Sequence, residues 1–189
     1  MMSGKQQQRQ QAKLQVGNLS VTEKIYYSQM VSEKLFELME IRCADTVLSY
    51  LASNNEVNLD EINGTMEKMG KIVAYPVCLN GEMEGYISKN ARYVLNQYGI
   101  REPNRADAMM MNKEAFDVVI VPLLGFDEKC GRLGHGGGYY DKYLKDYQGY
   151  KVGVAFEAQK LDGIIMEEND VYLDCIVTET NIYHRRIGE

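Results

Sequence analysis

The segment from Cys130 to Leu144, CGRLGHGGGYYDKYL, combines residue types that suit phosphate chemistry. Five of the eight residues from 131 to 138 are glycine, and glycine loses more conformational entropy on folding than any other residue. Such a loop lets backbone N–H groups converge on an anion. Arg132 can bind a phosphate through paired hydrogen bonds, and Asp141 suits a Mg²⁺ ion that also contacts phosphate oxygens.

The same loop has a simpler interpretation as a tight connection that ends in a capping glycine. One turn seldom needs five glycines, so the phosphate interpretation is favoured. No G-K-[ST] follows the loop, and its spacing departs from G-x-G-x-x-G, so the loop does not specify which phosphate. His135 either touches the ligand or fills a position that tolerates many residues, and the second interpretation is favoured.

A second set of cations lies near the N-terminus. Lys5, Arg9 and Lys13 are spaced four residues apart, so a helix would place them on one face. The residues alone favour a solvated end that frays, as termini often do. The alternative is a cationic stripe that faces an anion.

Composition excludes several classes of protein. The net charge of -6 argues against a nucleic-acid surface as the main function, and no apolar run is long enough for a membrane span. The first 13 residues lack the apolar segment of a secretion signal, which predicts a cytoplasmic protein. The four cysteines are scattered and suit a reducing compartment. We expect one domain over residues 1–189, and a monomer.

Strand and helix patterns alternate along the chain. Strands are predicted over 44–51, 71–79, 115–126, 150–156 and 174–179, with a short one near 82–88, and helices after Ser20, after Asn58 or Asp60, and over 139–147. The continuous apolar run of 115–126 is typical of a strand covered on both faces. This alternation predicts an α/β fold with a mostly parallel sheet flanked by helices.

Three local signals refine these elements. Ser20 and Glu23 form a capping-box pattern, and Gly70 is expected to end the helix after residue 60. Pro76 predicts an edge position or a bulge in its strand. Residues 109–111, three methionines, are expected to pack in a helix or a loop.

The segment 121–144, VPLLGFDEKCGRLGHGGGYYDKYL, resembles the signature of 5-formyltetrahydrofolate cyclo-ligases, also called 5,10-methenyltetrahydrofolate synthetases. The family pattern is Pro, a small apolar stretch, Phe-Asp, then G-x-R-L-G-x-G-x-G-Y-Y-D. The resemblance extends to KQQQR, YLASNNEVNLDEI, YGIREP, VGVAFEAQ and DVYLDCIVTE, and so covers nearly the whole chain.

This resemblance implies a fold similar to the sugar-phosphate isomerase and CoA-transferase type. It implies that ATP and Mg²⁺ are used to convert 5-formyltetrahydrofolate to 5,10-methenyltetrahydrofolate, with release of ADP and phosphate. Implied ATP contacts are Lys5, Arg9, Arg132, Leu133, Gly134, His135, Gly136, Gly137, Gly138, Tyr139 and Tyr140. Implied folate contacts are Leu51, Glu56, Tyr98, His135, Gly136, Gly137, Gly138 and Tyr139. Implied metal ligands are Asp141 and Asp174, and Arg132 is the implied catalytic residue.

The resemblance changes how several residues are interpreted. Without it, Glu56 is an ordinary loop carboxylate and Asp174 a strand-end residue. With it, Glu56 accepts hydrogen bonds from the pterin, Tyr98 stacks on a folate ring, and the N-terminal stripe contacts phosphate. Two other functions compete with the cyclo-ligase. One is a binding module without turnover, and the other is a sugar-phosphate isomerase or transferase, which requires a general base that the sequence does not clearly offer.

Overall fold

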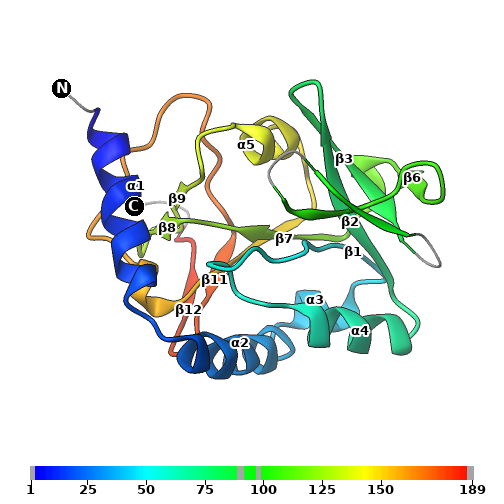
Figure 1. Ribbon diagram of the computed structural model, residues 1–189, viewed down its shortest axis with the longest axis horizontal. Helices are drawn as coiled ribbons and strands as arrows, with labels where there is room; N and C mark the ends of the chain where they lie inside the picture. The colour runs from blue at the N-terminus through cyan, green and yellow to red at the C-terminus, as the bar shows by residue number, and fades with distance from the viewer. Residues whose placement is uncertain (1–2, 89–91, 97–98, 187–189) are drawn as a thin grey trace.

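A single eight-stranded sheet runs through the middle of the molecule (Figure 1). The computed structural model describes residues 3–88, 92–96 and 99–186. The strand order is β12-β11-β10-β7-β1-β2-β3-β6. Its strands are β1 (Thr46–Leu48), β2 (Ile72–Leu79), β3 (Glu82–Ile87), β6 (Met109–Met111), β7 (Val118–Pro122), β10 (Tyr150–Val154), β11 (Cys175–Val177) and β12 (Ile182–His184). Two small hairpins add β4 (Tyr93–Leu95) with β5 (Arg101–Pro103), and β8 (Gly125–Phe126) with β9 (Arg132–Leu133).

The middle of the sheet is parallel, as the sequence predicts. The five strands β11, β10, β7, β1 and β2 run parallel to one another, while β12, β3 and β6 pair antiparallel at the two ends. The predicted strand over 115–126 is confirmed as β7, which ends at Pro122. Its apolar run is continuous because Val118 and Ile120 enter the core on one face, whereas Val119 and Val121 enter the core on the other.

Helices cover both faces of the sheet (Figure 1). The helices α2 and α4 lie on one face with the short α3, and α5 lies on the other, while α1 stands across the end near β8 and β9. Their bounds are α1 (Gly4–Gly17), α2 (Val21–Leu35), α3 (Met39–Cys43), α4 (Asp60–Lys68) and α5 (Tyr139–Leu144), with 3₁₀ turns at Lys113–Ala115 and Glu157–Gln159. Within the described ranges, none of these helices combines the length and apolar character that a bilayer crossing requires.

The first two helices are fixed at their starts by capping boxes. In α2, the hydroxyl of Ser20 accepts a hydrogen bond from the backbone N–H of Glu23, whose carboxylate accepts one from the N–H of Ser20. This confirms the predicted cap. Ser3 and Gln6 form the same arrangement at α1. The N-terminal segment is therefore a defined helix from residue 4 rather than a frayed end.

The start of α4 differs from the prediction, and its end agrees with it. Leu59 is the N-cap, without a side-chain cap, because Asn58 lies one residue too early. The amide oxygen of Asn58 still accepts a hydrogen bond from the N–H of Asp60. Gly70 follows the helix with φ +87°, the left-handed conformation that favours glycine.

Pro76 lies in an inner strand, not in an edge strand. It pairs with Gly85 of β3 on one side. On the other side, β2 pairs with β1 only over residues 72–74, so β2 extends past its neighbour at Pro76. The missing N–H of proline is tolerated there because no ladder continues on that side.

The methionine run was predicted wrongly. Met109–Met111 form β6, the edge strand beside β3, with Met109 and Met110 exposed. Pairing with β3 decides this local structure, and a run of three methionines carries no period that would have indicated a strand.

Candidate active site

A cleft of about 850 Å³ opens beyond the carboxyl ends of the parallel strands. Two prolines contribute to its wall. Pro122 is the last residue of β7, and Pro76 lies in the part of β2 that extends past β1. Ligands in open α/β sheets bind at this edge. The glycine loop forms a further part of the wall, with residues 134 to 138 all lining the cleft.

The β8–β9 hairpin fixes where the glycine loop begins. One carboxylate oxygen of Asp127 accepts hydrogen bonds from the N–H groups of Gly131 and Lys129, at 2.9 and 3.0 Å. Its other oxygen accepts one from the N–H of Ile164 at 2.8 Å. These bonds hold the turn, so that Arg132 enters the cleft from an anchored strand.

The glycines allow the loop to pass against two guanidinium groups. A Cβ at Gly134 would lie 3.0 Å from Nη1 of Arg132, and one at Gly136 would lie 3.5 Å from Cζ of Arg9. Gly136 and Gly138 also have φ of +105° and +67°, which L-residues with side chains rarely adopt. Close approach and backbone conformation together explain the cluster.

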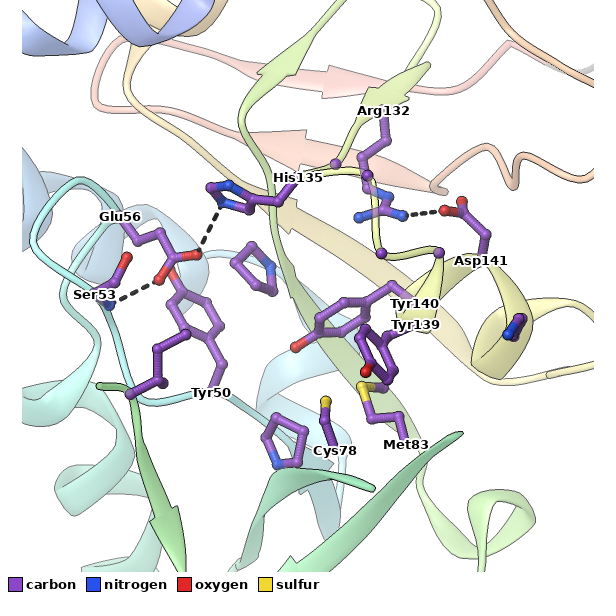
Figure 2. Close-up of a pocket in the computed structure, with 18 of the residues that line it drawn as sticks. Tyr50, Ser53, Glu56, Cys78, Met83, Arg132, His135, Tyr139, Tyr140 and Asp141 are labelled. Atoms are coloured by element: carbon purple, nitrogen blue, oxygen red, sulfur yellow. Dashed lines mark hydrogen bonds and ion pairs between the residues drawn. The ribbon is translucent and has the colours of Figure 1, made fainter. Parts of the chain in front are cut away.

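The guanidinium of Arg132 is buried and is held in place by Asp141 and Tyr140. Its side chain is 4% exposed, and Nη2 donates to Oδ2 of Asp141 at 2.8 Å (Figure 2). The guanidinium lies 5.6 Å from the ring centre of Tyr140. Its Nε is buried without a hydrogen-bond partner among the described residues. A buried donor without a partner is costly, and an anionic ligand in the cleft would satisfy it.

Helix α1 brings the N-terminal cations to the same cleft. Lys5 and Arg9 share a helix face with the buried Ala12 and Val16, because residues seven apart return to within about 20° in a helix of 3.6 residues per turn. Lys13 is rotated by about 80° from Lys5 on the same geometry, and it is exposed and does not line the cleft.

Lys5 and Arg9 are both engaged within the protein. The ammonium of Lys5, with 9% of its side chain exposed, pairs with the carboxylates of Asp170 and Glu167, the latter at 3.1 Å. Nε of Arg9 donates to the carbonyl of Gly134 at 3.0 Å. The cationic end of the cleft is therefore ordered by contacts that span most of the chain.

Glu56 lies across the cleft from Arg132, on the segment after β1 (Figure 2). Its side chain is 12% exposed. One oxygen accepts a hydrogen bond from the N–H of Ser53 at 2.8 Å, and the other lies 3.6 Å from Nε2 of His135. Burial alone raises the pKa of Glu56, but the contacts with His135 and Ser53 outweigh it, so the pKa is below its ordinary value.

An apolar wall adjoins both the carboxylate of Glu56 and the guanidinium of Arg132. Figure 2 shows the residues that form it: Tyr50, Cys78, Met83, Tyr139 and Tyr140. Burial raises the pKa of the Tyr50 and Tyr140 hydroxyls far above the ordinary value, so both stay neutral. Such a wall suits a flat aromatic ligand whose polar edge faces Glu56.

Comparison with known proteins assigns the chain to a family. The model of the "5-formyltetrahydrofolate cyclo-ligase family" matches residues 1–179. The chain belongs to this family. A probable 5-formyltetrahydrofolate cyclo-ligase of Schizosaccharomyces pombe is 34% identical over 175 residues, covering 82% of this chain and 86% of the relative. The 5-formyltetrahydrofolate cyclo-ligase of Escherichia coli K12 is 29% identical over 162 residues, covering 82% and 89%.

Solved structures of cyclo-ligases share the fold. The 5,10-methenyltetrahydrofolate synthetase of Aquifex aeolicus aligns with a TM-score of 0.86 and 31% identity, over 98% of this chain and 94% of that one. The enzyme from Mycoplasma pneumoniae aligns with a TM-score of 0.77 and 26% identity, over 94% and 99%. The predicted family and the predicted α/β fold are both confirmed.

Most of the site residues expected from the cyclo-ligase resemblance lie around this one cleft. They are Lys5, Arg9, Leu51, Glu56, Arg132, Gly134, His135, Gly136, Gly137, Gly138, Tyr139, Tyr140 and Asp141. Leu133 is fully buried beneath the loop and does not line the cleft. Tyr98 lies outside the described residues. The contacts of these residues with ATP or folate stay predictions.

Asp174 is not brought to the cleft. It precedes β11 at the amino ends of the parallel strands, where its N–H donates to the carbonyl of Lys151. Its carboxylate accepts hydrogen bonds from the N–H and the ammonium of Lys151, at 2.8 and 2.9 Å. Among residues 3–88, 92–96 and 99–186, no group of three or more His, Cys, Asp or Glu side chains is gathered as for a metal ion.

The resemblance did not indicate the acidic partners of Lys5. Glu167 and Asp170 line the cleft and pair with that ammonium. Their segment EEND reads as a solvated turn, and only the folded chain brings it to α1, across 165 residues of sequence.

Proposed function

We propose that this cyclo-ligase family member converts 5-formyltetrahydrofolate to 5,10-methenyltetrahydrofolate, with conversion of ATP to ADP and phosphate. The proposal rests chiefly on one observation. A single cleft joins a cationic, glycine-lined end to an apolar wall that finishes at a buried carboxylate. ATP and a folate are ligands of matching chemistry, since one carries phosphates and the other an aromatic ring with N–H donors.

The cationic end would hold the triphosphate. Arg132 offers a buried Nε that has no hydrogen-bond partner in the described part of the chain, and a guanidinium binds phosphate with directed hydrogen bonds. Lys5 and Arg9 add charge from α1. Fixed cations of this kind stabilise the charge that develops on a transferring phosphoryl group.

Asp141 would hold the magnesium ion at this end. Its carboxylate is 19% exposed and lies in the first turn of α5, the helix that follows the glycine loop. This donor fits Mg²⁺, which usually takes one or two carboxylates together with phosphate oxygens. When bound, the ion would neutralise phosphate charge. Asp174 is left out of this proposal because it lies at the other edge of the sheet, paired with Lys151.

The opposite end would hold the pterin. The Glu56 carboxylate can accept hydrogen bonds from the amino group and ring N–H of a pterin. Leu51, Tyr50 and Tyr140 supply the adjoining wall. The reacting formyl group would then lie between Glu56 and Arg132, near the transferring phosphate.

The chemistry needs no covalent nucleophile from the protein. The formyl oxygen attacks the γ-phosphorus, and the bond from that phosphorus to ADP breaks. The lone pair of N10 then attacks the formyl carbon, which is now activated. Its bond to oxygen breaks, phosphate departs with the formyl oxygen, and N10 loses its proton. The protein contributes alignment and charge stabilisation, the two main contributions in phosphoryl transfer.

A direct assay tests this proposal. The purified protein is incubated with 5-formyltetrahydrofolate and Mg-ATP, and the near-ultraviolet absorption of the methenyl product is followed. We expect product only when both substrates are present. A protein that is folded by circular dichroism and forms no product would overturn the proposal.

Two further proposals concern the oligomeric state of the protein and its cellular compartment. One copy of the chain supplies a cleft with both a cationic and an apolar part, and we propose that the protein is a monomer, which light scattering tests. Cys43, Cys78, Cys130 and Cys175 are all free thiols. Free thiols suit a reducing compartment, and we propose the cytoplasm.

A further inference from the structure

One contact in the cleft joins the glycine loop to the proposed pterin carboxylate. Nε2 of His135 lies 3.6 Å from Oε1 of Glu56 (Figure 2). The two residues come from opposite walls, so this pair spans the part of the cleft that a pterin would enter. The imidazole is 58% exposed, and Glu56 is its only ion-pair partner in the described part of the chain.

We propose that His135 sets the folate affinity of this enzyme, because it occupies Glu56 in the free protein and must release it when folate binds. A protonated imidazole holds the carboxylate more strongly than a neutral one does. Folate therefore binds more weakly as the pH falls. This inference rests on the proposed function, since it takes Glu56 to be the pterin contact.

The backbone permits such a release. Gly134 precedes His135, and Gly136 follows it with φ +105°, so glycines flank the residue on both sides. Arg9 fixes only the Gly134 end, through its bond to that carbonyl at 3.0 Å. The side chain can thus leave Glu56 while the start of the loop stays in place.

Several ionisable groups lie around the contact between His135 and Glu56. Glu56 stays ionised, since its pKa is below the ordinary value. Tyr50 and Tyr140, which face it from the wall, stay neutral because burial raises the pKa of each hydroxyl. The guanidinium of Arg9 on α1 also lies beside the loop. Histidine is the residue type whose charge commonly changes between about pH 5 and 8, so a comparison at two pH values tests the contact between His135 and Glu56.

Two substitutions and a control separate charge from shape. His135→Ala removes the partner, and His135→Lys keeps a positive charge throughout the range. His184→Ala removes the only other histidine, which is exposed on β12. The dissociation constant of 5-formyltetrahydrofolate is measured by calorimetry without ATP, at about pH 5.5 and about pH 8, on either side of the histidine transition.

The expected pattern differs for each protein. Wild type and His184→Ala bind folate about threefold more weakly at the lower pH than at the higher, as suits a largely exposed ion pair. His135→Ala binds with similar affinity at both values and more tightly than wild type at the lower one. His135→Lys binds weakly at both. A His135→Ala protein that keeps the wild-type pH dependence would overturn the inference.

A second measurement does not depend on folate binding. In the folded wild-type protein near pH 5.5, the imidazole Cε1–H signal of His135 is compared with that of Glu56→Gln by NMR. We expect the His135 signal to shift, while that of His184 does not. Unchanged His135 signals would refute the contact. If wild type binds no folate at all, the proposed function fails, whereas this spectrum still decides the contact.

Discussion

Glu56→Gln tests the folate end of the cleft with a change of charge and almost none of shape. The substitution replaces one carboxylate oxygen by an NH₂ group in a side chain that is 12% exposed. If Glu56 accepts hydrogen bonds from two pterin donors, glutamine can accept only one of them. Its NH₂ group then faces the second donor.

The size of the effect follows from this geometry. A hydrogen bond to a charged group contributes about 1.5 to 3 kcal/mol, and the lost bond leaves a pterin N–H without an acceptor. We therefore expect a loss of about 2 to 3 kcal/mol in folate binding, a rise of about 30- to 150-fold in KM. The KM for ATP should stay within about twofold, since the cationic end is untouched.

The assay is the initial rate of methenyl formation at varied folate with saturating Mg-ATP. Glu167→Gln is the control, because this carboxylate lines the same cleft at the Lys5 end. Its KM for folate should match that of wild type. A Glu56→Gln enzyme with an unchanged KM for folate would refute the placement of the pterin.

Three further substitutions test other parts of the account. Lys5→Ala should raise the KM for ATP about tenfold, whereas Lys13→Ala, on the exposed side of α1, should not; equal values would remove Lys5 from the phosphate site. Arg132→Lys keeps a charge but lacks the guanidinium fork, so kcat should fall about 100-fold in a protein with an unchanged circular dichroism spectrum; a wild-type kcat would contradict the role of Arg132. Burial raises the pKa of the Glu157 carboxyl, but its hydrogen bonds outweigh burial and lower the pKa below its ordinary value. The main one comes from the Tyr183 hydroxyl, at 2.5 Å. These hydrogen bonds therefore stabilise the folded protein above the ordinary pKa of glutamate, and this stabilisation is lost as the pH falls through the lowered pKa. In urea unfolding at neutral pH, Glu157→Gln should be less stable than wild type by about 0.5 to 1 kcal/mol. A stability difference that persists under acid conditions would count against this role of Glu157.

The sequence predicted the sheet well because its strongest signals are local. The apolar run of β7 and the capping box at Ser20 each reflect a few adjacent residues. Pairing partners are not local, and there the prediction failed. Met109–Met111 become a strand only because β3 lies beside them.

The site divides in the same way. The glycine loop, Arg132 and Asp141 are adjacent in sequence, so their chemistry could be interpreted together. Lys5 was linked to them only through family resemblance. Its partner Asp170 could not be predicted, because that ion pair closes over 165 residues of chain. The prediction of Asp174 as a metal ligand was wrong because the residue precedes β11, at the amino ends of the parallel strands and away from the cleft. Its residue type does not reveal that position.

In the proposed reaction, the formyl oxygen attacks the γ-phosphorus of ATP. This step is tested most directly with 5-formyltetrahydrofolate that carries ¹⁸O in the formyl group. After a single turnover with Mg-ATP, the released phosphate is examined by mass spectrometry. We expect the label to be transferred to phosphate, in equal amount to the methenyl product. Methenyl product accompanied by unlabelled phosphate would contradict it.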